Sequence, residues 1–324
     1  MAISLFIAFF ISAIIGYLLK GAALKGKFLM PKGVPVVGGI AIGASFYAVC
    51  LFSIFFQKNP MPQALGIIYS SLPILIFGVI DDWRELSVKS KLIVQLIACA
   101  LLIYSGVRTH IVYIGDVGNI IITFLWVVGI TNALNHLDVA DGVAGGVALI
   151  VSSAFVIISF LNPDPQTGAL AFILLAATAG FLIYNLPEAK IYMGNSGSHF
   201  LGFVLAALAL MVSYAPLERK VALLAPLLIL GFAIFDTGFL ILLRLGKRKL
   251  PFKKSNDHLA LRFLELGFSK KKALSAMLAL ALCFSVCGIL LVRATNFWGG
   301  VIVTGVILFS IAVAARMWKV KIDG

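Results

Sequence analysis

The sequence contains few charged residues for its length. Asp, Glu, Lys and Arg together make up 12% of the 324 residues, whereas 61% of the residues are hydrophobic. Water-soluble domains have about 25% charged residues, so a soluble globular protein is excluded. Apolar stretches of about 17 residues or more recur along the chain, and each can cross roughly 30 Å of hydrocarbon as a helix. The sequence therefore predicts a polytopic membrane protein.

Cysteine and histidine are also scarce, with four of each. The cysteines all fall in apolar stretches, so we expect buried small side chains and predict neither a disulfide framework nor a thiolate metal site. The first apolar stretch lacks a basic leader and a small-residue cleavage site, which predicts a retained helix. The cysteines are Cys50, Cys99, Cys283 and Cys287.

The apolar stretches predict one all-α membrane domain over residues 1–324. We expect a bundle of eleven transmembrane helices, or ten if one weak segment is re-entrant, together with a short amphipathic helix on the cytoplasmic side. The short connections leave no room for a separate soluble domain. The predicted spans are residues 3–19, 35–56, 64–80, 91–107, 117–134, 143–161, 169–185, 199–215, 221–243, 273–292 and 298–315.

The formal net charge is +13. In a soluble protein this excess would suggest a nucleic-acid partner, but in a membrane protein the placement of Lys and Arg reports topology first. Segments that follow odd-numbered predicted helices hold 21 of the 26 Lys and Arg residues. We therefore expect these segments in the cytoplasm, the N-terminus outside, the C-terminus inside, and no nucleic-acid partner.

Most acidic residues fall in the segments assigned to the cytoplasm. Asp81 and Asp82 follow the third predicted helix, and Asp138 and Asp141 follow the fifth. A spacing of three residues would place Asp138 and Asp141 on one face if that helix continued through them. Four carboxylates would repel by about 3 kcal/mol per pair at roughly 6 Å, so we expect a cation among them. Mg²⁺ suits oxygen ligands without paired His or Cys; solvated loop acids or helix caps are the alternative.

A glycine-rich segment and a basic segment lie on the same side. Residues 192–203, YMGNSGSHFLGF, combine glycines with the unpaired N–H groups of a helix start, which predicts an anion cradle, although glycine before a helix is often only a turn. Residues 246–273 predict a short helix ended by Gly267, which can anchor to anionic lipid or place His258 and Arg262 over phosphate oxygens. Its polar face would hold His258, Arg262 and Glu265, and its apolar face Leu259, Phe263 and Leu266.

Two further ionisable residues stand apart from these groups. Lys32 lies in PKGVPVVGG, between the first two predicted helices, where it would be a loop lysine if taken alone. Asp236 lies within the ninth predicted helix and must face the bundle interior or a cytoplasmic cavity, because a carboxylate is costly in hydrocarbon. Arg244, about two turns further along, is its expected partner.

Five motifs in chain order resemble those of the polyprenyl-phosphate N-acetylhexosamine-1-phosphate transferase family, glycosyltransferase family 4. They are KGVPVVGG, GVIDDWRELSVKSKLIVQ, TNALNHLDVADGVAGG, YNLPEAKIYMGNSGSHFLGF and the basic segment with His258, so the resemblance covers nearly the whole chain. It implies a Mg²⁺-dependent phosphotransferase, with Mn²⁺ as the alternative metal. It also implies a multi-pass protein of the bacterial cytoplasmic membrane with its active site on the cytoplasmic face.

The resemblance implies that the protein joins a lipid to a sugar phosphate. The phosphate of undecaprenyl phosphate, or of another polyprenyl phosphate, attacks the β-phosphate of a UDP-N-acetylated sugar and releases UMP. The product would serve synthesis of cell-envelope polysaccharide, lipopolysaccharide or peptidoglycan. A homodimer is left open.

The resemblance also implies roles for individual residues. Asp81 would be the base that activates the lipid phosphate, in a direct displacement for which a covalent phospho-aspartate is the competing mechanism. The implied catalytic residues are Asp81, Asp82, Asp138, Asp141 and His258; the substrate-binding residues are Lys32, Asn135, Gly194, Ser196 and Arg262; the metal ligands are Asp81, Asp82 and Asn195.

The chain departs from the family's pattern at three places. Asn195 stands where most relatives have a metal-ligating Asp, so we expect weaker metal binding or a metal held more by the substrate's phosphates. The basic segment reads DHLALR and retains His258 and Arg262 where relatives cluster two or three histidines, so the resemblance does not identify the sugar. Val139 and Ala140 replace the usual pair between the two acids.

Two other functions are compatible with the sequence. A catalytically silent relative that binds lipid phosphate or nucleotide would explain Asn195 and the missing histidines. A transporter or channel would need ionisable groups near the bilayer midplane and inverted repeats. Apart from Asp236, however, the cytoplasmic acids gather at one surface, and no repeat is evident. The sequence therefore favours the transferase.

Overall fold

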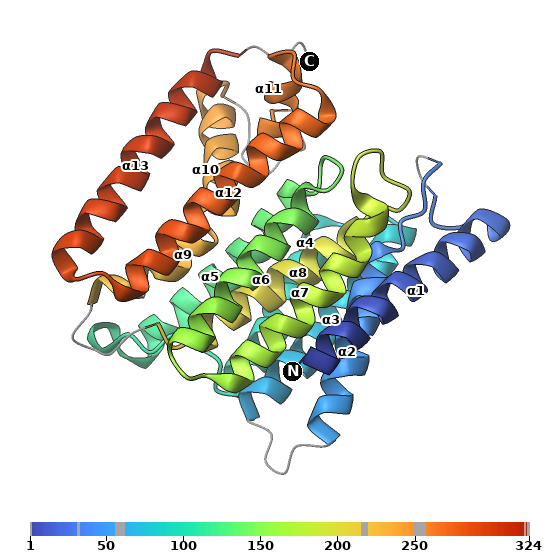
Figure 1. The fold of residues 1–324 in the computed structure, drawn as a ribbon, viewed down its shortest axis with the longest axis horizontal. Coiled ribbons are helices and arrows are strands. Elements are labelled where there is room, and N and C mark those ends of the chain that lie inside the picture. Colours follow the sequence, from blue (N-terminus) through green and yellow to red (C-terminus); the bar gives the residue numbers. More distant parts are fainter. Residues whose placement is uncertain are drawn as a thin grey trace. The chain divides into compact units, whose positions relative to one another are not determined.

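The structure, a computed structural model, describes residues 2–30, 33–55, 62–214, 220–248, 257–320 and 322. These residues form helices and no strand, with one isolated bridge between Val36 and Tyr192. The all-α fold of a multi-pass membrane protein is therefore confirmed. The chain divides into two compact units, Met1–Ser213 and Tyr214–Gly324 (Figure 1). The single domain expected over the whole chain stays a prediction.

Each unit has its own set of helices. The first contains α1 (Ala2–Gly26), α2 (Gly38–Phe55), α3 (Pro62–Trp83), α4 (Val88–Tyr104), η1 (Val112–Ile114), α5 (Gly115–Leu137), α6 (Val143–Leu161), α7 (Pro165–Asn185) and α8 (Gly194–Met211). The second contains η2 (Lys220–Leu224), α9 (Ala225–Ile229), α10 (Gly231–Gly246), α11 (Leu259–Glu265), α12 (Lys270–Arg293) and α13 (Asn296–Trp318).

The predicted count of eleven spans is not confirmed. Within the described ranges, nine helices are long and apolar enough to cross a membrane, or ten if one bent pair counts as a single span. Every predicted span corresponds to a helix, but α4 is only 17 residues long. The ninth predicted span bends by 69° between Lys220–Ile229 and Gly231–Gly246. The short length of α4 and the break in the ninth predicted span therefore account for the difference between eleven predicted spans and nine candidate helices.

Helix α12 fits into this break. The hydroxyl of Ser285 donates a hydrogen bond of 3.1 Å to the carbonyl oxygen of Ile229, the last residue of α9. A break frees backbone carbonyls, and in a membrane-spanning segment such groups need a protein partner. Gly231, the first residue of α10, lies two residues further on, and a Cβ there would be 2.5 Å from the Phe284 ring. The break is therefore stabilised by specific contacts with α12.

Helix α8 is the central helix of the first unit. Fourteen of its eighteen residues are buried, and it packs against α2, α3, α5, α6 and α7 (Figure 1). Glycines let its first turn approach two neighbours closely. A Cβ on Gly78 of α3 would lie 2.4 Å from Ser196 Cα, and one on Gly39 of α2 would lie 2.2 Å from Gly197 N. The start of α8 is therefore held directly between α2 and α3.

Backbone hydrogen bonds join the segments that precede α2 and α8. The N–H groups of Gly38 and Gly39 donate to the carbonyl oxygens of Tyr192 and Met193, at 3.0 and 2.9 Å. In the other direction, Tyr192 N–H donates to Pro35 O at 2.8 Å. Two motifs about 150 residues apart in sequence, KGVPVVGG and the glycine-rich segment, thus form one local structure.

The short helix of the basic segment is present as α11, and Gly267 follows it with a positive φ of 83°. The predicted separation of its faces is wrong. Arg262 is buried together with Leu259 and Phe263, whereas Leu266 is exposed. The cause is an ionic network around Arg262, described below.

Candidate functional site

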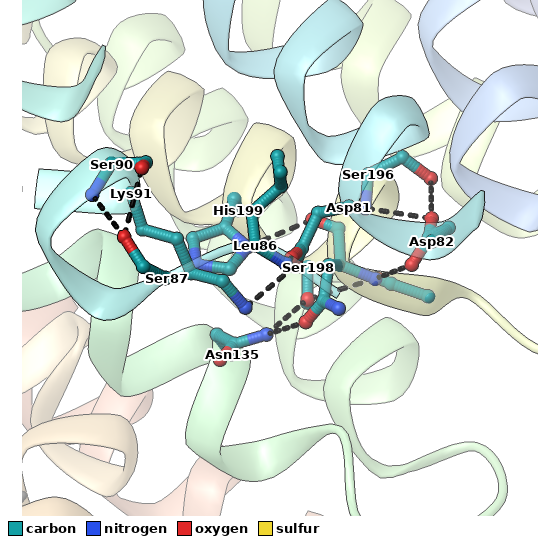
Figure 2. A network of polar contacts seen from close by, with 12 residues as sticks. Asp81, Asp82, Leu86, Ser87, Ser90, Lys91, Asn135, Ser196, Ser198 and His199 are labelled. Carbon is teal, nitrogen blue, oxygen red and sulfur yellow. Dashed lines mark hydrogen bonds and ion pairs between the residues drawn. The ribbon is translucent and has the colours of Figure 1, made fainter. Parts of the chain in front are cut away.

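The carboxylate of Asp82, at the end of α3, binds the start of α8. Its Oδ1 accepts a hydrogen bond from Asn195 N–H at 2.6 Å, and its Oδ2 accepts from Ser196 N–H at 3.0 Å and Ser196 Oγ at 2.6 Å (Figure 2). The first N–H groups of a helix have no partner within the helix, and they carry its positive dipole end. Asp82 therefore caps α8 from a distant part of the chain.

Asp138 binds the same helix end. It is the residue after Leu137, where α5 ends, and it accepts a hydrogen bond from Gly194 N–H. Burial, together with the negative charges of Asp82 and Asp141, raises the pKa of Asp138 to about 7, although the hydrogen bond from Gly194 acts to lower it. Two carboxylates thus occupy the N–H groups of residues 194–196.

These contacts correct two predictions. The start of α8 is no free anion cradle, because its first three N–H groups already bind carboxylates of the same chain. Helix α5 also does not continue through the two acids that follow it, so Asp138 and Asp141 do not share a helix face. The expected convergence of the acids does occur, since Asp138 lies close enough to Asp82 and Asp141 for their charges to act on it.

Asp81 has a lysine partner. This carboxylate is 4% exposed; its Oδ2 lies 2.6 Å from Lys91 Nζ, and its Oδ1 accepts from Leu86 N–H at 2.7 Å. Ser87 caps α4 through a 3.1 Å bond from Ser90 N–H, which places Lys91 in the first turns of that helix (Figure 2). The sequence analysis missed Lys91, although this cation lies ten residues after Asp81 within one of the quoted motifs.

Asp141 holds the loop that leads to α8. Its Oδ2 accepts a hydrogen bond of 3.1 Å from Ala189 N–H. Asn185 completes the connection, since its Oδ1 accepts from Gly142 N–H and its Nδ2 donates to Ile191 O, both at 3.0 Å. Asn185, a buried amide at the end of α7, is another residue that the sequence analysis missed.

Asn135 and Asn195 bind each other at the centre of the site. Nδ2 of Asn135 donates to Asn195 Oδ1 at 3.0 Å and to Ser198 Oγ at 2.9 Å. The backbone oxygen of Asn195 lies 2.9 Å from His199 Nδ1, one helical turn further on. His199, 7% exposed, also escaped the sequence analysis, because a single histidine in an apolar helix gives no signal.

The side chains as placed do not fit the expected Mg²⁺ site. In the part of the chain that the structure describes, no group of three or more His, Cys, Asp or Glu residues is arranged to hold a metal. Lys91 and backbone or hydroxyl donors bind the oxygens of Asp81 and Asp82, and Asn135 binds the oxygen of Asn195. The positive partners expected among the acids are thus supplied by Lys91 and by the start of α8.

The remaining predicted residues belong to other segments of the chain. Lys32 falls outside the described residues. His258 directly precedes α11 in the second unit, and Arg262 within α11 is 2% exposed. The Arg262 guanidinium donates to Met317 O at 2.7 Å and to Val320 O, and Asp257 Oδ1 lies 3.4 Å away. Arg262 therefore joins α11 to the end of α13, and its action on phosphate stays a prediction.

Asp236 has a different partner from the one expected. It accepts a hydrogen bond from the backbone N–H of Leu259, the first residue of α11. Arg244 instead experiences the charge of Asp257, which also pairs with Lys247 at 2.5 Å. The predicted pair of Asp236 and Arg244 is therefore wrong: Asp236 fixes the start of α11.

Comparisons with known proteins agree with the resemblance found in the sequence. The sequence profile of glycosyl transferase family 4 matches residues 64–213. The chain is 30% identical over 286 residues to a probable undecaprenyl-phosphate N-acetylglucosaminyl 1-phosphate transferase of Bacillus subtilis, covering 86% of this chain and 79% of that protein. It is 30% identical over 276 residues to the decaprenyl-phosphate N-acetylglucosaminephosphotransferase of Mycobacterium leprae, covering 74% and 68%. Over 204 residues it is 31% identical to the phospho-N-acetylmuramoyl-pentapeptide-transferase of Staphylococcus haemolyticus, covering 56% and 63%.

The cap on α8 predicts a graded loss of stability. Asp82→Asn removes the charge and leaves one oxygen for three donors, so we expect the free energy of unfolding to fall by about 2–3 kcal/mol. Ser196→Ala removes one donor and should cost about 1 kcal/mol. Reversible unfolding in detergent micelles measures both values, and equal losses in the two variants would contradict the cap.

The raised pKa of Asp138 predicts that stability depends on pH. Because this pKa is about 7 in the folded chain, against 3.8 ordinarily, the folded state binds the proton more tightly than the unfolded state. The stability contributed by protonated Asp138 is therefore fully present below pH 3.8 and is lost as the pH rises through about 7. We expect the thermal midpoint of the wild type to fall between pH 5 and pH 8 by more than that of Asp138→Asn. Parallel curves for the two proteins would rule this out.

Proposed function

The chain belongs to glycosyl transferase family 4, and we propose that it transfers an N-acetylated hexosamine 1-phosphate from a UDP-sugar to a polyprenyl phosphate. Two relatives are named for undecaprenyl or decaprenyl phosphate together with N-acetylglucosamine, which supports this substrate class. The observation that carries the proposal is the meeting of Asp82 and Asp138 at the start of α8, with Asp81 directly before Asp82 at the end of α3. These acids come from two separate motifs within the matched residues 64–213.

The proposed reaction is a direct displacement at phosphorus. An oxygen of the lipid phosphate forms a bond to the β-phosphorus of the UDP-sugar, and the bond from that phosphorus to the oxygen of the α-phosphate breaks. The products are polyprenyl-diphospho-sugar and UMP. Asp81 is the proposed base that accepts the proton of the lipid phosphate, and this role requires Lys91 to release one of its oxygens.

We also propose that Mg²⁺ takes part in the reaction, but with fewer protein ligands than the sequence predicted. Since the predicted protein ligands bind other groups, we propose that the ion is held more by the diphosphate of the donor than by the chain. The neutral Asn195 supports this view, because a carboxamide offers an oxygen without a charge.

The proposal includes a place in the cell. The cytoplasmic membrane of a bacterium is the proposed location, with the acids on the cytoplasmic side, the N-terminus outside and the C-terminus inside. The excess of Lys and Arg in the segments near these acids supports this orientation. A UDP-sugar is made in the cytoplasm, so this side gives it access to the site.

A transfer assay tests the function. Purified protein is incubated with undecaprenyl phosphate, Mg²⁺ and a panel of UDP-sugars, and UMP release and the mass of the lipid product are measured. We expect product from a UDP-N-acetylated sugar and at least about a thousandfold loss in Asp81→Asn, with Asp116→Asn, on the exposed outer pair with Arg108, as the control. Binding of UDP-sugar without UMP release would instead favour a silent relative, and full activity of Asp81→Asn would remove this residue from the base role.

The proposed role of Mg²⁺ predicts that a negative charge at position 195 lowers the Mg²⁺ concentration that turnover requires. Asn195→Asp keeps an oxygen that can accept from Asn135 and adds a negative charge beside Asp82. We expect the Mg²⁺ concentration for half-maximal turnover to fall by about tenfold, roughly the effect of 1.4 kcal/mol. A Mg²⁺ titration of both proteins measures it, and an unchanged requirement would contradict the proposal.

A further inference from the structure

The orientation of the Asn195 side-chain amide follows from a chain of hydrogen bonds that begins at a backbone carbonyl. Ser198 Oγ lies 2.9 Å from Gly194 O, and a carbonyl oxygen can only accept, so Ser198 donates its single hydroxyl proton there. Ser198 Oγ must therefore accept from its second partner, the side chain of Asn135, at 2.9 Å (Figure 2). The atom of Asn135 at this contact is thus its nitrogen, Nδ2.

The same nitrogen determines which atom of Asn195 faces Asn135. Nδ2 of Asn135 has two protons and donates one to Ser198 Oγ and the other to the side chain of Asn195, at 3.0 Å. The Asn195 atom at this contact has to accept, so it is Oδ1, and the NH₂ group lies on the other side of the amide. The carbonyl group of Gly194 therefore fixes the amide of Asn195 through two intermediate side chains.

The NH₂ group of Asn195 is open to a ligand. Its nitrogen makes no hydrogen bond to any residue that the structure describes. Asn195 is half-buried, and within the described chain Nδ2 is not one of the buried polar atoms that lack a partner, so it reaches the surface. The backbone N–H groups of residues 194–196 are occupied, because they donate to Asp82 and Asp138. A ligand at this place therefore meets the side-chain NH₂ group and not the helix start.

An aspartate at position 195 would present the opposite kind of group. One of its oxygens could accept from Asn135, as Oδ1 of Asn195 does, and the second oxygen would take the place of Nδ2. That oxygen would carry negative charge and could bind Mg²⁺, whereas an amide NH₂ group offers two donors and no oxygen. Asn195 therefore presents a group that matches an anion, where the resemblance led us to expect a metal ligand.

We propose that Nδ2 of Asn195 donates a hydrogen bond to a phosphate oxygen of the UDP-sugar's diphosphate, and that Asn195 is not a metal ligand. The inference rests on the proposed function and identifies a direct contact between this chain and its donor. Each phosphorus of a UDP-sugar carries about one negative charge, whereas the phosphate monoester of a lipid carries about −1.5 to −2. An uncharged donor beside the carboxylates of Asp82 and Asp138 suits the lower charge, since it cannot neutralise the higher one.

Equilibrium binding of UDP-N-acetylglucosamine to the full-length protein in nanodiscs tests this without turnover. The titration contains no lipid phosphate, and EDTA replaces Mg²⁺. We expect the wild type to bind the UDP-sugar under these conditions. Asn195→Ala removes the donor and should weaken binding by about fivefold, whereas Asn195→Asp also adds a negative charge and should weaken it by about thirtyfold. Uridine should bind all three proteins alike, because it lacks phosphate.

A matched control and a second titration separate this effect from a change in folding. Gln166→Glu makes the same change from amide to carboxylate at the start of α7, about 30 Å along that helix from Asn185, and should alter binding by less than about twofold. With saturating Mg²⁺, Asn195→Asp should return to within about threefold of the wild type, because its carboxylate can then bind the ion. This recovery would also show that the variant is folded. Mg²⁺ should leave the deficit of Asn195→Ala unchanged.

The outcomes separate this inference from the proposed function. Equal affinity of the wild type and Asn195→Ala without metal overturns the inference, and so does a wild type that binds UDP-N-acetylglucosamine only after Mg²⁺ is added. Farnesyl phosphate serves as the lipid probe: if its binding, and not that of the UDP-sugar, weakens in the order Asn, Ala, Asp, the assignment to the diphosphate is overturned. If UDP-sugar binding follows this order but no UDP-sugar yields UMP with undecaprenyl phosphate, the proposed function fails and the role of Asn195 stands.

Discussion

The hydrogen bonds between the start of α8 and the carboxylates of Asp82 and Asp138 are the interaction on which the site depends. They fix the end of α3 and the turn after α5 to the same helix end, which also packs against α2. A helix N-terminus carries about half a positive charge, so it stabilises nearby carboxylates that would otherwise repel. This explains how two acids can stay close together in an apolar protein.

The same interaction determines where the substrates' negative charge can be accommodated. Phosphates cannot bind the N–H groups of residues 194–196 while the acids do, so they need cations from other groups. Lys91 is such a group, and a metal brought by the diphosphate would be another. Asn195 fits this arrangement physically: its neutral side chain accepts from Asn135 and adds no further charge beside Asp82 and Asp138.

Much of this arrangement followed from the sequence. Long apolar stretches located the helices, and the acidic motifs located the residues that meet at the start of α8.

The hydrogen-bond partners of these acids could not be predicted in the same way. That Asp82 would cap a helix more than 110 residues away, or that Asp141 would bind the backbone of Ala189, depends on three-dimensional packing that no local pattern encodes. The face assignment of α11 failed for a similar reason, because the backbone carbonyl oxygens of Met317 and Val320, distant in sequence, bind Arg262. Lys91 and His199 both lie in the quoted motifs, but nothing in the sequence sets either residue apart from its neighbours there.

An experimental structure of the protein with its UDP-sugar bound tests the central claim most directly. The quantity to measure is what lies within about 3 Å of the backbone nitrogens of Gly194, Asn195 and Ser196. The account predicts the carboxylate oxygens of Asp138 and Asp82 at these positions, with the diphosphate elsewhere in the site. Phosphate oxygens on these nitrogens, with the two carboxylates displaced, would contradict it.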